Sequence, residues 1–364
     1  MPVITYREAL RLALIEEMER DPEVFVIGEE VAQYQGTFRV TEGLLDRFGP
    51  ERVIDTPISE EGFTAISVGA AMMGLKPVVE FMTINFSIRA LDAIVNHAAK
   101  NYYMSGGQFP CNMVIRGPNG KGEQLAAQHS HALEAWFMHM PGLKVVLPST
   151  PADARGLLKA AIRDPNPVVF LEHAALYNLK GEVSDEEHVE PLGKAVVRRK
   201  GEHVTLISYS RMAQVCEKAA EELAKEGIEA EVLDLRSLLP IDDERLAEAV
   251  AKTHRAVVVT EASRTGSAAS EITARIQGLV FDELDAPVEL VNGPDTPLPY
   301  SRPLERLWAP DENSIIEAAK RTLWRRPGSS SVAIGRAIHA AAVDAENGRG
   351  DGGRHHRPLA QERR

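Results

Sequence analysis

Short, uninterrupted apolar runs alternate with helical patterns along most of this chain, and this alternation is what most limits its fold. Thr5 and Glu8 stand at capping-box spacing and predict a helix over residues 5–20, followed by the apolar run 24–27. Continuous apolar strands between helices are typical of a parallel sheet covered on both faces. The other strands expected in this half are residues 77–81, 113–116, 144–147 and 168–172, with helices at 86–103 and 152–163. We therefore expect an α/β, doubly wound domain that binds ligands at the carboxyl ends of its strands.

A second alternation follows a break in the pattern at residues 178–202, where Gly, Pro and charged residues replace the apolar runs. Its expected strands are residues 204–208, 229–235, 256–260 and 288–291, and its expected helices are 212–226, 243–253, 267–277 and 314–324. The sequence thus predicts two doubly wound α/β domains. We place them at residues 1–180 and 203–324, joined by a linker at 181–202. The Gly-, Ser-, Arg- and His-rich residues 325–364 are predicted to be a disordered tail.

Composition excludes several classes of protein. The formal net charge of −12 argues against nucleic acid as the main partner. No apolar run approaches the roughly 20 residues that span a bilayer, so no membrane partner is expected. Cys111 and Cys216 lie far apart in the sequence, which implies neither a disulfide framework nor a clustered zinc site. With no signal-peptide pattern at the N-terminus, a cytoplasmic location is predicted.

The segment 55–63 (Asp-Thr-Pro-Ile-Ser-Glu-Glu-Gly-Phe) is the first candidate for chemistry. A proline turn there delivers Glu60 and Glu61 to the start of a helix of small residues. Acids in a first helical turn suit the helix dipole, so both acids can be plain, solvated helix-start residues. Alternatively one turns inward, where an apolar pocket raises the pKa of a carboxyl group and lets it hold or pass a proton near neutral pH. These residues alone leave both interpretations open.

Four other segments each have a functional and a structural interpretation. The Gly-rich loop 116–122 lacks the Ser or Thr of a phosphate-binding P-loop, and is either a flexible active-site wall or a plain turn. His129 is a candidate acid, base or orienting group, and His131, two residues on, does not share a helix face with it as a metal pair would. Residues 81–86 are core or a stacking surface for a planar ring. Residues 160–167 form a capped turn or offer oxygen ligands to a cation.

Several motifs then occur in the order found in one known family. They are Asp-Thr-Pro-Ile-Ser-Glu at 55–60, Glu-Phe-Met-Thr-Ile-Asn-Phe at 80–86, Asn-Tyr-Tyr-Met-Ser-Gly-Gly at 101–107, Arg-Gly-Pro-Asn-Gly at 116–120, Ala-Ala-Gln-His-Ser at 126–130, Pro-Gly-Leu-Lys-Val-Val at 141–146 and Asp-Leu-Arg-Ser-Leu-Leu-Pro-Ile-Asp at 234–242. With them the chain resembles the E1 β subunits of 2-oxo acid dehydrogenase complexes, and pyruvate dehydrogenase E1 β most closely. The resemblance covers about residues 4–323.

The resemblance implies a thiamine diphosphate pyrimidine-binding domain followed by a transketolase C-terminal-like domain. It implies an α2β2 heterotetramer, with the cofactor shared between an E1 α and an E1 β subunit. The α subunit would bind the diphosphate and Mg2+ through a Gly-Asp-Gly motif that this chain cannot complete, because its own Gly350-Asp351-Gly352 stands too near the C-terminus. The chain is therefore expected to be inactive alone. The implied reaction decarboxylates pyruvate, a small-molecule 2-oxo acid, and passes the acetyl unit to a lipoyl group of E2 dihydrolipoyl acyltransferase.

Site residues carry over from the resemblance position by position. Glu60 would hydrogen-bond N1′ of the aminopyrimidine ring and, buried, share a proton with it. His129 would orient or protonate groups during transfer to lipoamide, whereas Glu61 and His131 are given no role. The remaining cofactor contacts implied are Glu29, Ile58, Met82 and Phe86. A structural potassium ion is implied near Met113, Ala161, Ile162, Asp164 and Asn166.

Two alternative functions remain beside this one. The first alternative is that the implied E1 enzyme acts on a branched-chain 2-oxo acid or on acetoin instead of pyruvate, which a substrate panel would distinguish. The second is that the chain is mainly a structural subunit that docks E1 to E2, an interpretation that the presence of both Glu60 and His129 disfavours.

Overall fold

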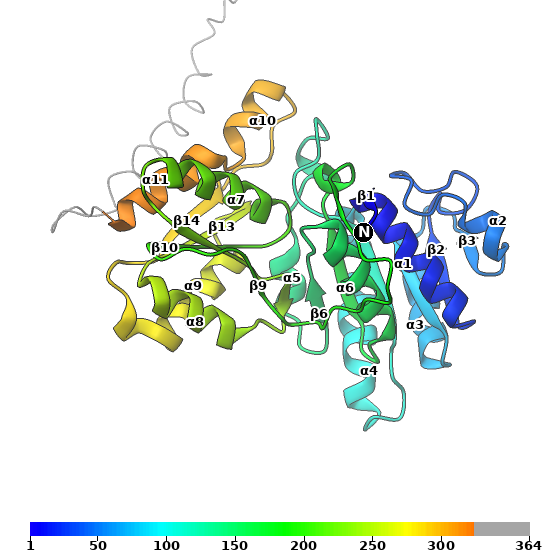
Figure 1. Ribbon diagram of the computed structural model, residues 1–364. Coiled ribbons are helices and arrows are strands. Elements are labelled where there is room, and N and C mark those ends of the chain that lie inside the picture. The colour runs from blue at the N-terminus through cyan, green and yellow to red at the C-terminus, as the bar shows by residue number, and fades with distance from the viewer. Residues whose placement is uncertain (324–364) are drawn as a thin grey trace, which may run out of the picture. The chain divides into compact units, whose positions relative to one another are not determined.

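Two largely parallel sheets, each flanked by helices, form the frame of the protein (Figure 1). The computed structural model describes residues 1–323, so the predicted tail at 325–364 lies outside the described residues. The prediction of an α/β chain with parallel sheets is confirmed, and every expected strand has a counterpart within a few residues.

The first sheet has seven strands in the order β12-β6-β7-β5-β4-β2-β3. Their bounds are β2 Val24–Gly28, β3 Val53–Asp55, β4 Lys76–Glu80, β5 Val114–Pro118, β6 Lys144–Val146, β7 Val168–Glu172 and β12 Ser237–Leu239. All neighbours are parallel except β12 and β6. Every residue of β2, β5 and β7 is buried, because helices cover both faces, and this explains why these strands are mostly apolar.

Six α-helices belong to this half, and two of them, α1 and α6, begin at a side chain that caps them. The six are α1 Tyr6–Arg20, α2 Leu44–Phe48, α3 Glu60–Met72, α4 Ala99–Met104, α5 Glu134–Met138 and α6 Pro151–Arg163. Thr5 caps α1 through a full capping box with Glu8, as predicted, and Thr150 caps α6 by accepting from the Asp153 N–H. The regular helix predicted over residues 86–103 is instead a 3-10 segment (η1 Ile84–Ala90), a π segment (η2 Ala93–Ala98) and α4. Apolar spacing predicts which side is buried but does not determine the hydrogen-bonding step.

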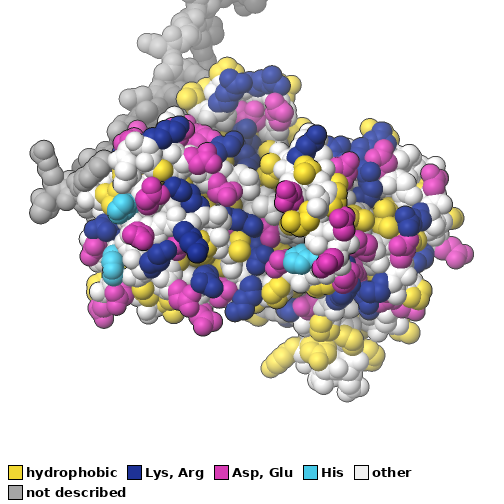
Figure 2. All heavy atoms as spheres, viewed as in Figure 1, with side chains coloured by type: hydrophobic (Ala, Val, Ile, Leu, Met, Phe, Trp, Pro, Cys, Tyr) yellow, Lys and Arg dark blue, Asp and Glu magenta, His cyan; other side chains and the backbone are white. Residues whose placement is uncertain are grey.

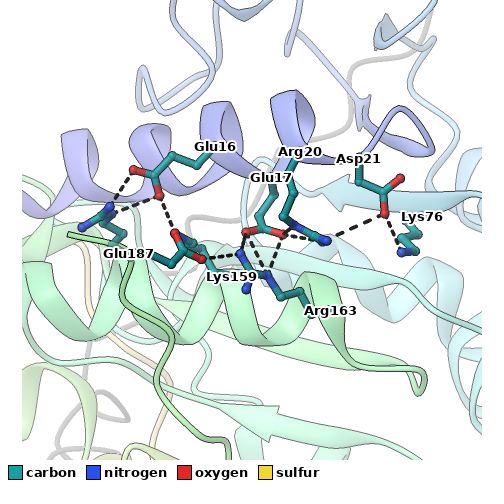
Figure 3. A network of polar contacts seen from close by, with 9 residues as sticks. Glu16, Glu17, Arg20, Asp21, Lys76, Lys159, Arg163 and Glu187 are labelled. Carbon is teal, nitrogen blue, oxygen red and sulfur yellow. Dashed lines mark hydrogen bonds and ion pairs between the residues drawn. The ribbon is translucent and has the colours of Figure 1, made fainter. Parts of the chain in front are cut away.

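Helices α1 and α6 lie side by side over one face of the first sheet and are joined by an ion network (Figure 3). Glu17, fully buried, accepts hydrogen bonds from Arg163 and Arg20. Lys159 is equally buried and donates to Glu16 and Glu187. Because each buried charge has an opposite charge beside it, the polar faces of two helices can meet inside the fold.

The second sheet has five strands in the order β14-β13-β10-β11-β9, with only β9 antiparallel. These strands are β9 Val196–Arg199, β10 Val204–Ser208, β11 Ala230–Asp234, β13 Ala256–Ser263 and β14 Glu289–Gly293. The helices of this half are α7 Ser210–Lys225, α8 Asp243–Thr253, α9 Ala268–Val280, α10 Arg302–Trp308 and α11 Glu312–Leu323. Three further 3-10 turns are η3 Ala127–His129, η4 Ala174–Leu176 and η5 Phe281–Glu283.

The segment predicted as a linker, residues 181–202, carries regular structure. β8 (Lys180–Glu182) pairs antiparallel with β1 (Val3–Thr5), and β9 joins the second sheet. In the other direction, β12 from the second half extends the first sheet, and one cluster of buried apolar residues continues from Phe25 to Ile276 across both sheets. The two halves therefore share a core. Within residues 1–323, no helix is both long and apolar enough to cross a membrane.

Candidate functional site

Four neighbouring strands of the first sheet end at one edge, and most of the predicted site residues follow them. The register pairs Gly28 of β2 with Asp55 of β3 and with Glu80 of β4, and Glu80 in turn with Arg116 of β5. Glu29, Thr56, Phe81 and Asn119 are thus the first residues beyond, or near, adjacent strand ends. In sheets of this kind ligands bind at the carboxyl ends of the strands.

The two acids at the start of α3 differ in exposure. Glu60 is the first residue of the helix and is half-buried, whereas Glu61 is exposed. The preceding Ser59 makes no side-chain capping bond to the N–H groups of the first turn. The helix dipole favours negative charge at this position, where both acids stand. The structure thus separates the pair, as one inward and one outward acid would require.

Glu29 supplies a second carboxyl group close to Glu60. Its side chain is buried, and its Oε1 has no hydrogen-bond partner among the described residues. Burial raises the pKa of Glu29 above its usual value, and the negative charges of Glu60 and Glu30 raise it further. A buried carboxyl group whose ionisation is opposed by a neighbouring carboxylate is suited to hold a proton. The Thr56 hydroxyl, also buried, likewise lacks a partner in this part of the chain.

An aromatic pair stands at the same edge. The rings of Phe86 and His129 meet edge-to-face, with centroids 5.3 Å apart and planes at 88°. Phe63, one turn after Glu60, packs on Phe81 with ring centroids 5.4 Å apart, which ties the start of α3 to the segment that carries Met82 and Phe86. Phe86 and His129 are both half-buried, so each keeps surface free for a ligand.

The other residues predicted to contact the cofactor differ in exposure. Met82 is half-buried beside Phe81, while Ile58 is 81% exposed on the turn before Glu60. His131 is largely exposed, but the part of its ring that is buried lowers its pKa, and the nearby His129 lowers it further. Its backbone N–H donates to Asn85 Oδ1 at 2.9 Å.

A buried ion cluster lies directly beneath this edge and was missed by sequence reasoning. The Arg116 guanidinium, 1% exposed, forms two hydrogen bonds to Glu172, at 2.6 and 2.7 Å, and another to Glu80. The Tyr177 hydroxyl donates to the same Glu172 at 2.7 Å. Burial raises the pKa of Glu80, although Arg116 works against that rise. The available signal was one charged residue near the end of each of three apolar strands.

The predicted potassium residues gather at the opposite edge of the sheet, before β5 and after α6. The Met113 carbonyl accepts from Val168 N–H at 3.0 Å, and the Ala161 carbonyl from Asp164 N–H at 3.3 Å. Asp164 accepts from Asn166 N–H at 2.9 Å and forms an ion pair with Lys144. Ala161 and Ile162 are fully buried near the end of the same helix. An ammonium group therefore already occupies the acidic part of this turn, and potassium binding stays a prediction.

The edge fits one half of a cofactor site. Two carboxyl groups, one with a buried oxygen that has no hydrogen-bond partner within residues 1–323, lie at the same edge as an aromatic pair, and this suits the polar rim and flat face of a nitrogen heterocycle. In residues 1–323 no group of three or more His, Cys, Asp or Glu side chains is placed to hold a metal ion.

Comparison with known proteins identifies the two domain families of the chain. Residues 3–180 match the family described as the transketolase pyrimidine binding domain, and residues 193–315 match the transketolase C-terminal domain. A solved structure of a split-gene transketolase, described as an inactive β4 tetramer, has the same fold with a TM-score of 0.72 at 24% identity, over 88% of this chain and 98% of that one.

Relatives that match over most of their length have a higher sequence identity to this chain. The mitochondrial pyruvate dehydrogenase E1 component subunit β-2 of Oryza sativa is 51% identical over 326 residues, which cover 88% of this chain and 87% of that protein. The E1 component subunit β of Rickettsia conorii is 50% identical over 321 residues, 88% and 98% of the two chains. The chain belongs to the family of pyruvate dehydrogenase E1 component β subunits, the thiamine-dependent family that the motifs predicted.

Proposed function

We propose that this chain supplies the ring-binding half of the thiamine diphosphate site in an E1 enzyme that decarboxylates pyruvate and acetylates the lipoyl group of E2. The observation that carries the proposal is the acid pair: within residues 1–323 the buried Oε1 of Glu29 has no hydrogen-bond partner, and the charge of Glu60, at the start of α3, raises the pKa of Glu29. Such a pair needs a donor, and a ring nitrogen that carries a proton provides one.

Thiamine diphosphate, when bound, supplies the electron sink for decarboxylation of a 2-oxo acid. The Glu60 carboxyl group would lie against the ring nitrogen and share a proton with it, and Glu29 beside it would bias where that proton rests. Phe86 and Met82 would contact the ring face and exclude water from it. His129, held edge-on by Phe86, is oriented to give or take a proton at the acyl acceptor.

The partner that completes the site is an E1 α subunit, which would bring the diphosphate and Mg2+ sites in an α2β2 assembly. Exposed apolar side chains support a partner here. Ile66 on α3 and Met73, the residue that follows the helix, are 67% and 84% exposed, and Gly69 between them leaves open space. At the end of α4, hydrophobic side chains gather on the surface (Figure 2). These are Tyr102, Tyr103, Met104 and Phe109. Faces of this kind are typical of interfaces.

Two further assignments belong to the same proposal. A potassium ion beside Asp164 would have to share or replace the Lys144 ammonium, so a K+-dependent rise in melting temperature that Lys144→Met strengthens is the expected sign. A cytoplasmic location stays a prediction from the two distant cysteines, both of which are free and buried.

Coexpression with the α subunit tests the main claim. We expect pyruvate turnover only from the assembled protein, with thiamine diphosphate and Mg2+ present. In that assembly Glu60→Gln should lower kcat at least about 100-fold while the fold stays intact, because it removes the proton-holding group. The matched control is Glu61→Gln, one residue on and exposed, which should keep near-normal activity. Full turnover by the chain alone, or by the Glu60 variant, would refute the proposal.

A further inference from the structure

His129 is carried by a closed loop, residues 119–131, which we call the histidine loop. Its ends are joined by a hydrogen bond from Gly120 N–H to the His131 carbonyl at 2.8 Å. Inside it, the Gly122 N–H donates to Ser130 Oγ at 3.2 Å. β5 ends just before this loop, so the first sheet fixes the start of the loop but not the chain that follows.

The histidine loop is held in an unfavourable backbone conformation. Gln124 and Ala126 both have positive φ angles, +53° and +60°, which cost a residue with a side chain roughly 1 kcal/mol each. Conformations of this kind persist only where surrounding contacts enforce them. The contacts that enforce this one must therefore come from outside the loop.

Two buried carboxylates of the second half of the chain provide those contacts. Glu261, on β13, accepts a hydrogen bond from the Lys121 N–H at 2.5 Å, and Glu305, on α10, accepts one from the Gln124 N–H at 3.0 Å. Both side chains are almost fully buried, at 6% and 2% exposure. Backbone N–H groups bonded to ionised acceptors are among the stronger hydrogen bonds in proteins.

Glu261 is itself fixed in charge and position. His173 Nε2 lies 2.9 Å from the Oε1 that Lys121 N–H also meets, and Arg211 donates to Oε2 at 3.1 Å. Although burial alone would raise the pKa of Glu261, His173, Arg211 and the loop N–H together lower it to about 2. Gly120 leaves room for this contact, because a Cβ there would fall on Glu261 Oε1.

We propose that Glu261 is a positioning residue for the reaction: it holds the histidine loop in the conformation that presents His129 beside Phe86. The assignment rests on the function proposed above for His129. It links the second half of the chain to the catalytic edge of the first, although Glu261 itself does not reach the edge-to-face pair.

The test compares Glu261→Gln with Glu123→Gln in E1 reconstituted with its α subunit and cofactor. Glu123 is the matched control, since it lies in the same loop but is exposed and, within residues 1–323, pairs only with the exposed Arg302. Hydrogen exchange of the loop amides should become at least about tenfold faster in Glu261→Gln alone, because the loss of the ionised acceptor favours loop opening. Should Glu261→Gln fail to fold, Glu261→Asp, which keeps the charge but withdraws it by one methylene, carries the same measurement.

Kinetics separate positioning from general support of the fold. We expect Glu261→Gln to lower kcat for lipoyl acetylation at least about tenfold with little change in KM for pyruvate, and to cost much less when His129 is already alanine. An equal loss in both backgrounds, or unchanged loop exchange, would overturn the inference. If His129→Ala alone has no effect, the role of His129 is wrong, while loop exchange still tests the anchor.

Discussion

Replacing Arg116 by methionine removes the cation that lies between Glu80 and Glu172. It is the sharpest test of how the edge of the first sheet beside Glu29 and Glu60 is supported. The guanidinium is 1% exposed and binds both oxygens of Glu172 and one of Glu80. Breaking a buried ion pair from one side costs about 3–5 kcal/mol, since it leaves charge without a partner. Methionine has a similar reach and keeps most of the packing.

This loss of free energy corresponds to a lower melting temperature. An unfolding entropy of about 2.1 cal/mol/K per residue gives about 0.7 kcal/mol/K over residues 1–323, so the variant should melt about 4–7 °C lower at pH 8. The loss should shrink as the pH falls. The pKa of Glu80 is already raised by burial, and without Arg116 it rises further. An acid whose folded-state pKa lies above its unfolded value destabilises the protein above that pKa, and the penalty disappears once it is protonated.

Thermal unfolding followed by circular dichroism at pH 8 and pH 5.5 checks both parts. Arg245→Met is the control: this arginine pairs with Glu248 at 2.9 Å, but both are about half-exposed, so the change should cost under about 1 kcal/mol at either pH. A variant at Arg116 that melts like the parent, or whose deficit does not shrink at pH 5.5, would refute the view that uncompensated charge is what matters here.

Two other predictions concern the helix network and the aromatic wall. Lys159 and then Arg163 lower the pKa of Glu187 to about 2, so its contribution is present above pH 4.5 and is lost toward pH 2; Glu187→Gln should therefore lower the free energy of unfolding at pH 6, by less than about 1 kcal/mol because the side chain is 62% exposed. At pH 2 the variant and the parent should melt at the same temperature. Phe86→Ala should weaken cofactor binding about tenfold or more, measured by titration of the assembled enzyme, and loosen the ring of His129; Phe86→Leu, which keeps apolar bulk but no ring, should fall between.

The parts of the fold that the sequence predicted are those set by local chemistry. Uninterrupted apolar runs mark strands such as β2 and β7 because both faces are covered, and the capping box of Thr5 and Glu8 marks the start of α1. The turn that delivers Glu60 and Glu61 to the first turn of α3 is equally local, since proline and small residues define it. The prediction for the helix over residues 86–103 failed at the level of hydrogen-bonding pattern, which apolar spacing does not encode.

What the sequence did not predict depends on contacts between residues far apart in the chain. Arg116 looked like the first residue of a loop, yet it pairs with a carboxylate 56 positions away. The Gly-rich loop looked flexible, yet Glu261 holds it from 140 positions away. The antiparallel addition of β12 to the first sheet is of the same kind. Such pairings depend on the final register of two sheets, and no single window of sequence carries that information.

One helix joins assembly to chemistry in this chain. Glu60 begins α3, and Ile66 of the same helix and Met73 just after it form an exposed apolar side. We expect a subunit that covers this side to cover also the turn that holds Ile58, which is 81% exposed, and to reduce the access of water to Glu29 and Glu60. Charges interact more strongly in a less polar medium, so the charge of Glu60 would then raise the pKa of Glu29 further. We therefore expect association with a partner to favour a proton bound at Glu29.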